Sequence, residues 1–400
     1  MEPPRGRGWI ENANLRVPAT VRSGRCERRL TEEPQQTLRT LLETVILPIH
    51  HDRWGGSDAW VACVDFQRQL GSHGWTAPGW PVEIGGLGLS IEQQVACEGV
   101  YFDLGAPRRV SVYGVNNVGP TIAAHGTPAQ KRHLQAIVDV DEVWCQGFSE
   151  PDAGSDLASL RTRADRMDDG FTINGQKIWT SIGLNATHCL LLARTDPEAP
   201  KHQGISAFLV PLDLPGITRR PIRQINGEEE FAELFFDDVK VPATSVLGPI
   251  DRGWQVTMTT LGYERAGVLS ISGQLAIEAE TTVRDLARRG ELGGPRLDRA
   301  MRIFVRAQLL RTSGERALSA EAGTPGPLST VIKLAWSSLA TDVAEFLVDT
   351  RGFEVVAGAD PTVSERFLRS RALTIAGGTT EVLKNLVAER VLGLPKDPTR

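Results

Sequence analysis

The fold of this chain is decided by residues 144–156, near its middle, with the sequence W-C-Q-G-F-S-E-P-D-A-G-S-D. An apolar run from Trp144 to Phe148 leads into a turn and predicts a strand that ends there. Pro151 fixes its own φ and Gly154 permits a positive one, so the backbone forms a shaped loop. Two serine hydroxyls beside this loop suit contact with a flat polar ligand. The same chemistry also fits a plain surface turn between a strand and a helix.

Around this stretch the hydrophobic period is two, from Trp144 to Gly248, which predicts a small β domain. Asn174-Gly175 between two short apolar runs predicts a hairpin with a two-residue turn. Further strands are expected at 189–193, 205–212 and 232–241. The outer segments have helical periodicity instead, with expected helices at 58–70, 91–102, 119–138, 254–286, 297–318, 328–350 and from Thr380 onward.

This order predicts a mainly α protein with an inserted β domain. The expected units are an N-terminal helical domain at 31–143, the β domain at 144–248 and a C-terminal helical domain at 249–400. Residues 1–30 carry seven arginines, three glutamates and three prolines, and they are expected to be a disordered or non-native extension.

Composition excludes several classes of function. The net charge of -5 argues against nucleic-acid binding, and no apolar run approaches the roughly 20 residues that span a bilayer. The five cysteines lack CxxC spacing, so we expect reduced thiols in a cytoplasmic protein. The seven histidines are equally dispersed, and no metal site is expected.

Four motifs, spread over residues 31–395, resemble those of the acyl-CoA dehydrogenase family in the family's order. They are S-E-P-D-A-G-S-D at 149–156, N-G-Q-K-I-W-T-S at 174–181, F-F-D-D-V-K-V-P at 235–242 and I-A-G-G-T-T-E-V at 375–382. The resemblance implies a central β-barrel-like domain between helical domains, the last of them a four-helix bundle. It also implies FAD as the cofactor, an acyl-CoA substrate, electron-transfer flavoprotein as acceptor, and a homo- or hetero-oligomer.

The resemblance also implies which residues bind. The hydroxyls of Ser149 and Ser181 would contact the flavin ring, and the indole of Trp179 would pack against it. The other implied cofactor contacts are Gln146, Phe148, Ser155, Thr180, Gly378, Thr379 and Glu381, and the implied substrate contacts are Ser155, Tyr263 and Arg265. By chemistry alone, Trp179 also fits a core aromatic, and 377–381 also fits a plain helix start with Thr379 as cap.

The chain departs from the common family pattern at the catalytic base. The family's usual glutamate in the C-terminal motif is Gly377 here, whereas Leu261-Gly262-Tyr263-Glu264-Arg265 resembles members of the isovaleryl and long-chain types, with the base on an earlier helix. The resemblance therefore implies that Glu264 removes the α-proton of the thioester. By chemistry alone a Glu-Arg pair on such a helix also fits a solvated face.

Two segments that anchor FAD in many members differ as well, at 284–291 and at 349–355. The leading hypothesis is FAD-dependent α,β-dehydrogenation of an acyl-CoA. The alternatives are an oxidase or flavin monooxygenase of the same fold, and a non-catalytic FAD-binding subunit of a heteromeric dehydrogenase.

Overall fold

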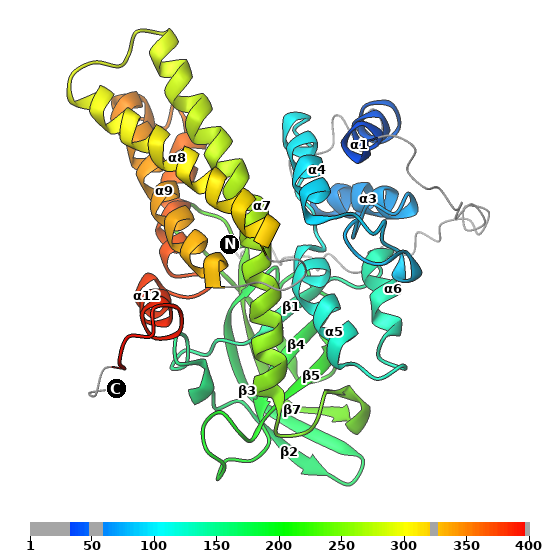
Figure 1. Cartoon of the computed structure of the whole chain (residues 1–400). Coiled ribbons are helices and arrows are strands. Elements are labelled where there is room, and N and C mark those ends of the chain that lie inside the picture. The colour runs from blue at the N-terminus through cyan, green and yellow to red at the C-terminus, as the bar shows by residue number, and fades with distance from the viewer. Residues whose placement is uncertain (1–32, 48–58, 321–326, 397–400) are drawn as a thin grey trace, which may run out of the picture.

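The computed structural model describes residues 33–47, 59–320 and 327–396, and the extension expected at 1–30 lies outside these residues. Helical segments come first, then a sheet, then helices again, which confirms the predicted fold class (Figure 1). None of the described helices is long and apolar enough to cross a membrane.

The N-terminal helices form the first layer. They are α1 (Pro34–Leu41), α3 (Ala59–Ser72), α4 (Ile91–Asp103), α5 (Gly119–His125) and α6 (Arg132–Val138). Phe66 and Leu70 of α3 pack with Leu38 and Leu42 in a buried cluster, which holds these helices together through apolar burial.

The helix expected at 119–138 is wrong in its middle, because α5 and α6 are separated there. Gly126 leaves the helical conformation at φ -78° and ψ 146°. Thr127 and Gln130 then cap one another, with Thr127 N donating to Gln130 Oε1 at 2.9 Å and Gln130 N to Thr127 Oγ1 at 3.3 Å. These two bonds close a turn over residues 127–131, and α6 begins only after it, at Arg132.

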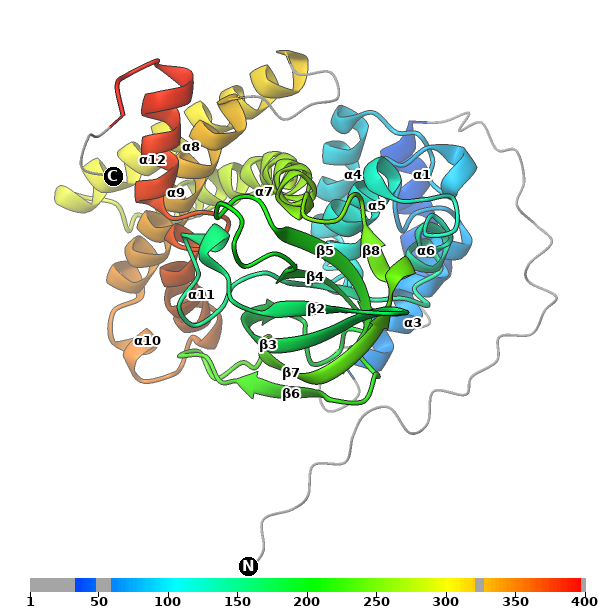
Figure 2. The same ribbon diagram turned by 90° about the horizontal axis from the view of Figure 1, so that it is seen from below.

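The second layer is an eight-stranded sheet with the strand order β6-β7-β3-β2-β4-β5-β8, and β1 pairs with β4 in parallel. The strands are β1 (Trp144–Gly147), β2 (Arg163–Met167), β3 (Gly170–Ser181), β4 (His188–Arg194), β5 (Ile205–Pro211), β6 (Ile217–Ile222), β7 (Phe231–Pro242) and β8 (Val246–Leu247). Figure 2 shows the sheet between the N-terminal helices on one side and helices α11 and α12 on the other.

The hairpin predicted at Asn174-Gly175 is wrong, because both residues lie within the continuous strand β3. The Asn174 side chain instead bonds to Asp238 across a register shift between β3 and β7. A Cβ at Gly175 would lie 2.5 Å from Thr162 Oγ1, so the glycine permits a close approach of the chain before β2 rather than a turn. The hairpin closes earlier, since Met167 pairs with Gly170.

The third layer is the C-terminal helical array. It contains α7 (Gly253–Arg288), α8 (Pro295–Ala320), α9 (Pro327–Arg351), α10 (Phe353–Val356), α11 (Pro361–Ser370) and α12 (Thr380–Leu386). Small and large side chains such as Ala279, Ala307 and Phe346 interlock in its core. Helix α7 runs between this array and the N-terminal helices (Figure 1), so its residues can face both.

Candidate active site

The loop after β1 is held against β3 by a buried ion pair. Lys177 is 0% exposed and Glu150 8%, and Lys177 Nζ lies 2.7 Å from Glu150 Oε1. Lys177 also donates to the carbonyl of Phe148 at 3.1 Å, while Glu150 accepts from the backbone N–H groups of Arg161 and Thr162. Because a buried charge must be paired, this interaction fixes the first two motifs relative to each other.

A bulge in β3 turns one predicted flavin contact outward. The register between β3 and β7 shifts between Lys177 and Thr180, and Trp179 has a φ of 60°. Its indole is therefore 56% exposed, and it makes an edge contact with the ring of Phe231. β-bulges commonly re-aim a side chain beside a functional site, and the core-aromatic interpretation of Trp179 does not fit this exposure.

The neighbours of Trp179 present polar groups beside it. Ser181 is half-buried at the end of β3, and the backbone N–H of Ile178 donates to the Ser149 carbonyl at 2.9 Å, which joins the two serine-bearing segments. Among the described residues, the buried atoms Thr180 Oγ1 and Gln146 Nε2 have no hydrogen-bond partner. Unpaired buried polar atoms cost free energy, so a ligand that pairs with them is stabilised.

Glu264 of α7 meets the C-terminal motif in space. A Cβ built on Gly377 would lie 3.1 Å from Glu264 Oε1. The carboxylate that α7 supplies therefore stands where a glutamate side chain at position 377 would begin. Positions 264 and 377, distant in sequence, therefore meet at one point.

Lys333 of α9 is a further charged group at this point, and the sequence analysis missed it. It is buried, and its Nζ donates to the carbonyls of Leu373 at 3.1 Å and Gly378 at 2.8 Å. Burial lowers the pKa of Lys333, and the negative charge of Glu264 opposes this. A lysine within an apolar helical pattern gives no sequence signal for such a role.

Tyr113 is a further residue beside Ser181 that the sequence analysis missed. Burial raises the pKa of its hydroxyl, Ser181 lies within hydrogen-bonding reach of it, and the charges of Glu230 and Glu264 act on it. Glu230 in turn pairs with Arg108 and with Arg369, whose Nη1 lies 2.8 Å from Glu230 Oε2. This carboxylate therefore ties together the N-terminal helices, the sheet and the C-terminal helices around the site.

The other predicted site residues differ in their exposure and surroundings. Phe148 is buried, Ser155 and Glu381 are exposed, and Tyr263 is half-buried on α7. Thr379 caps α12 by accepting from Val382 N at 3.2 Å, and Gly378 precedes it with a φ of 98°. The side chain of Arg265 lies outside the part of the chain whose side chains are described.

These residues fit a flavin. The exposed indole of Trp179 offers a flat apolar surface, and the unpaired polar atoms of Gln146 and Thr180 offer hydrogen bonds beside it. The start of α12 offers backbone N–H groups after two glycines, an arrangement that suits a phosphate or ribose.

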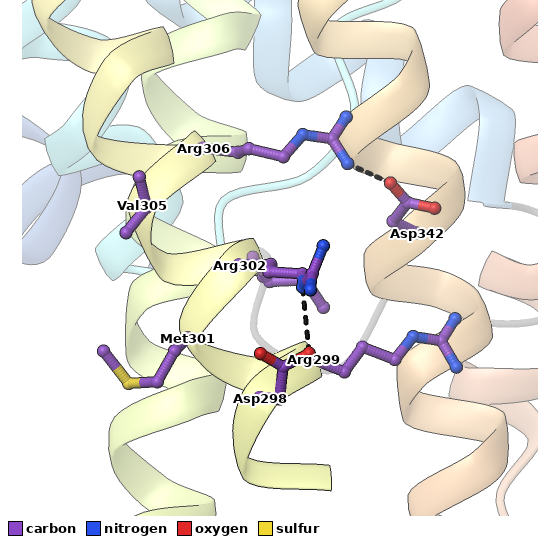
Figure 3. A pocket seen from close by; sticks show the side chains of 8 residues that line it. Asp298, Arg299, Met301, Arg302, Val305, Arg306 and Asp342 are labelled. Carbon is purple, nitrogen blue, oxygen red and sulfur yellow. Dashed lines mark hydrogen bonds and ion pairs between the residues drawn. The ribbon is translucent and has the colours of Figure 1, made fainter. Parts of the chain in front are cut away.

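A cavity of about 570 Å³ lies away from this site, on the outer face of α8 against α9. Figure 3 shows its wall, where Arg306 pairs with Asp342 and Arg302 with Asp298. No predicted site residue lines it. Along the same helix an apolar stripe is 44–62% exposed at four-residue steps, at Leu297, Met301, Val305 and Leu309.

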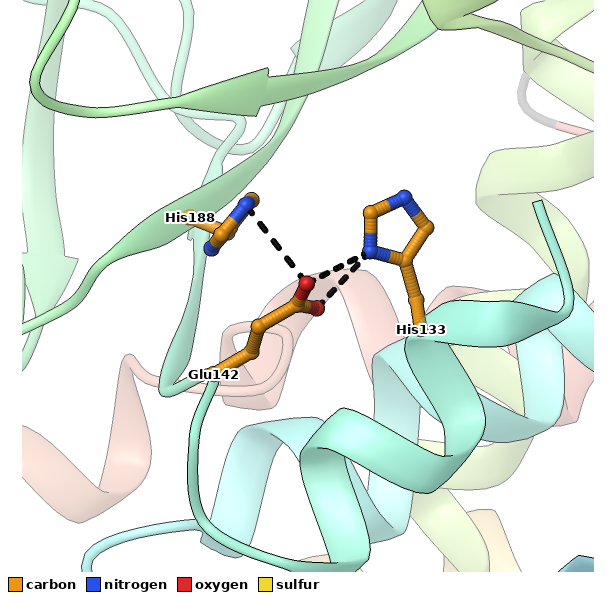
Figure 4. Close-up of side chains that lie close together, drawn as sticks. All are labelled: His133, Glu142 and His188. Atoms are coloured by element: carbon orange, nitrogen blue, oxygen red, sulfur yellow. Dashed lines mark hydrogen bonds and ion pairs between the residues drawn. The ribbon is translucent and has the colours of Figure 1, made fainter. Parts of the chain in front are cut away.

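A second group outside the site brings together two histidines and a glutamate (Figure 4). His133 Nδ1 lies 2.8 Å from Glu142 Oε2, Trp144 Nε1 donates to the same oxygen at 3.0 Å, and His188 Nε2 is 3.8 Å from Oε1. Burial acts to raise the pKa of Glu142, but His133 and His188 together lower it by more, so the carboxylate is ionised. Its oxygens already accept hydrogen bonds, and the group ties α6 to the sheet. The sequence spacing gave no sign of this cluster.

The chain matches three family models in order. They are described as the acyl-CoA dehydrogenase N-terminal domain at residues 30–139, middle domain at 145–239 and C-terminal domain at 251–392. The curated relative "Acyl-CoA dehydrogenase IpdE1" of Mycolicibacterium smegmatis is 39% identical over 349 residues, covering 83% of this chain and 88% of the relative.

Two solved structures are similar throughout. One, "Tcur3481-Tcur3483 steroid ACAD", has a TM-score of 0.77 at 30% identity and covers 96% of this chain and 99% of its own. The other, the ChsE4-ChsE5 complex from Mycobacterium tuberculosis, has a TM-score of 0.78 at 30% identity and covers 93% and 99%. The predicted family and class of enzyme are thereby confirmed. This chain belongs to the acyl-CoA dehydrogenase family, whose members are flavoprotein oxidoreductases.

Proposed function

We propose that this protein removes two hydrogens from the α and β carbons of an acyl-CoA thioester, with FAD as its cofactor and Glu264 as its base. The observation that carries the proposal is the position of Glu264 Oε1, 3.1 Å from the point where a side chain at Gly377 would begin. When bound, FAD supplies the hydride acceptor that no side chain can provide.

The protein's own residues would then act as the base, bind the flavin or bind the substrate. Glu264 takes the α-proton, which requires an ionised carboxylate held rigidly within about 3–3.5 Å of the reacting carbon. Ser149, Ser181, Thr180 and Gln146 offer hydrogen bonds to the flavin. Trp179 and Phe148 offer aromatic surface, and the remaining cofactor contacts are Ser155, Gly378, Thr379 and Glu381. Tyr263, Arg265 and Ser155 contact the substrate.

The base is tested by Glu264→Gln. This variant should retain FAD and bind acyl-CoA, while the rate of flavin bleaching under anaerobic acyl-CoA falls by several powers of ten. Glu278→Gln is the matched control, because Glu278 lies on the same helix but pairs with Arg366. A normal bleaching rate in Glu264→Gln would show that the base is elsewhere.

Supplying the carboxylate from position 377 instead of 264 gives a second test of the base. Gly377→Glu in the Glu264→Gln background should recover part of the activity, because both positions reach the same point. The recovery should be incomplete, since the φ of 66° at Gly377 strains any other residue.

We also propose that the protein works as an oligomer packed through its C-terminal helices and passes its electrons to an electron-transfer flavoprotein. The exposed stripe on α8 supports the assembly, because exposed apolar rows commonly mark protein interfaces. Two similar structures are named for pairs of chains, ChsE4-ChsE5 and Tcur3481-Tcur3483, so a different family member is a candidate partner. Light scattering that shows a stable monomer at micromolar concentration would refute the assembly.

A further inference from the structure

A cavity of about 230 Å³ adjoins the candidate active site on the side of the N-terminal helices. Its wall includes Trp60 from the first turn of α3, Arg108, Arg109 and Val112 from the segment after α4, and Tyr113 and Ile182. At about 30 Å³ for each non-hydrogen atom, it has room for about seven or eight of them.

Two of its residues connect this cavity directly to the site. Ile182 follows Ser181 in sequence, and its N–H donates to the Glu230 carbonyl at 2.8 Å. Tyr113 also lines it, and its hydroxyl lies beside Ser181. A group bound beside Ser181 can therefore extend past Ile182 and Tyr113 into the cavity.

The wall combines apolar and cationic side chains. Trp60, Val112 and Ile182 suit a hydrocarbon or ring. Arg108 and Arg109 also line the cavity, and a purely aliphatic tail would gain nothing from their two guanidinium groups.

The Nε–H group of Arg109 is available as a hydrogen-bond donor. Its Nη1 lies 2.5 Å from Glu98 Oε1, and its guanidinium stacks 4.2 Å above the centre of the Tyr101 ring. Its Nε is buried and, among the described residues, has no hydrogen-bond partner. A buried donor left unpaired costs free energy that a ligand oxygen would recover.

The charges around the cavity nearly cancel. Arg109 is paired with Glu98, and Arg108 is paired with Glu230. A second carboxylate brought in by the substrate would have to compete with these glutamates. The balance therefore favours a neutral oxygen, such as a ketone or hydroxyl, over an anionic one.

We propose that this cavity selects acyl-CoA substrates whose distal end carries a neutral oxygen acceptor, and that Arg109 donates to it. This inference rests on the proposed function, because it assigns the tail of the acyl group that Glu264 would deprotonate. Sites built to hydrogen-bond a polar group discriminate strongly against analogues without it.

The test uses the FAD-bound protein and three acyl-CoAs of equal chain length, which end in a methyl group, a methyl ketone and a carboxylate. Binding is measured by calorimetry with their unreactive thioether analogues, and turnover by flavin bleaching. The ketone should bind more than about tenfold more tightly than the methyl-ended chain. Equal binding of these two, or tighter binding of the carboxylate, would overturn the inference.

Variants assign the preference to this cavity. Arg109→Met should reduce the ketone preference to within about twofold, whereas Arg302→Met on the exposed face of α8 should leave it unchanged. Should Arg109→Met fail to fold, Val112→Phe replaces it. Filling the cavity in this way should abolish binding of all three long chains while butanoyl-CoA still bleaches the flavin. An unchanged preference in Arg109→Met, or undiminished long-chain binding in Val112→Phe, would overturn the inference.

The two proposals fail in different ways. If all chains bleach the flavin but bind equally, the inference is wrong and the dehydrogenase proposal stands. If the ketone chain binds selectively and nothing bleaches the flavin, the cavity assignment stands and the proposed reaction is wrong.

Discussion

Removing Lys177 should destabilise the protein sharply, because it is the counter-ion of a buried carboxylate. In Lys177→Met the carboxylate of Glu150 stays buried without its counter-ion. It keeps the backbone N–H groups of Arg161 and Thr162, which compensate only part of the loss. The Phe148 carbonyl also loses its 3.1 Å partner.

The magnitude follows from this geometry. Breaking a buried ion pair by removing one partner costs about 3–5 kcal/mol. The two remaining N–H groups place this site at the lower end, at about 3 kcal/mol. If the 400-residue chain unfolds as one unit, that corresponds to a fall of roughly 4 °C in the midpoint of thermal unfolding.

Thermal unfolding of the wild type, Lys177→Met and the double variant Lys177→Met/Glu150→Gln measures the effect. Because the double variant buries no uncompensated charge, it should recover more than half of the loss. FAD retention should weaken in the single variant, since the Ser149 loop is no longer held to β3. A fall of less than about 2 °C, or a double variant less stable than the single one, would refute this account of the pair.

Three further changes test other parts of the site. Gly377→Ala should slow flavin reduction in stopped-flow measurements while FAD stays bound, because its methyl group meets the Glu264 carboxylate at 3.1 Å and a φ of 66° costs it about 1–2 kcal/mol. Lys333→Met should lower the unfolding midpoint and speed FAD release, since the Gly378 carbonyl loses its donor. An unchanged rate of FAD release would show that the segment around Gly378 does not hold the cofactor. Burial acts to raise the pKa of Glu230, but its two arginine partners hold it below the ordinary value. Its stabilising effect is therefore fully present above a pH of about 4.3 and is lost as the pH falls further, so Glu230→Gln should be less stable than the wild type at about pH 7, and this difference should shrink progressively as the pH falls below about 4.3.

Much of the fold could be predicted, because hydrophobic period and motif order carry it. Helix α7 and the sheet between helical segments follow directly from these patterns. The wrong hairpin at Asn174-Gly175 arose because that pair has the same sequence signature in a turn and at a bulge. Only the neighbouring chain segments decide between the two, through Thr162 and Asp238. Helix α11 was missed because its amphipathic pattern is short and follows closely on Gly358.

For the candidate site, sequence alone revealed residues that belong to motifs and missed those that do not. Glu264 and Gly377 could be connected through family resemblance, but their proximity could not. Tyr113, Glu230 and Lys333 act through contacts between domains, and such long-range pairing leaves no local pattern. The proposed roles of the predicted residues and the domain boundaries stay predictions.

The meeting of positions 264 and 377 bears on how such enzymes diverge. Because two elements reach one point, the acid can pass from one element to the other by two substitutions. If the old carboxylate is lost before the new one is gained, the intermediate chain has no base. If the new carboxylate is gained before the old one is lost, two carboxylates lie side by side. They cannot both ionise and would share one proton. Under the proposed function the shared proton leaves one carboxylate ionised, so this order keeps a base, although a slower one because of the strain at position 377. Glycine at 377 removes both this strain and the second carboxylate.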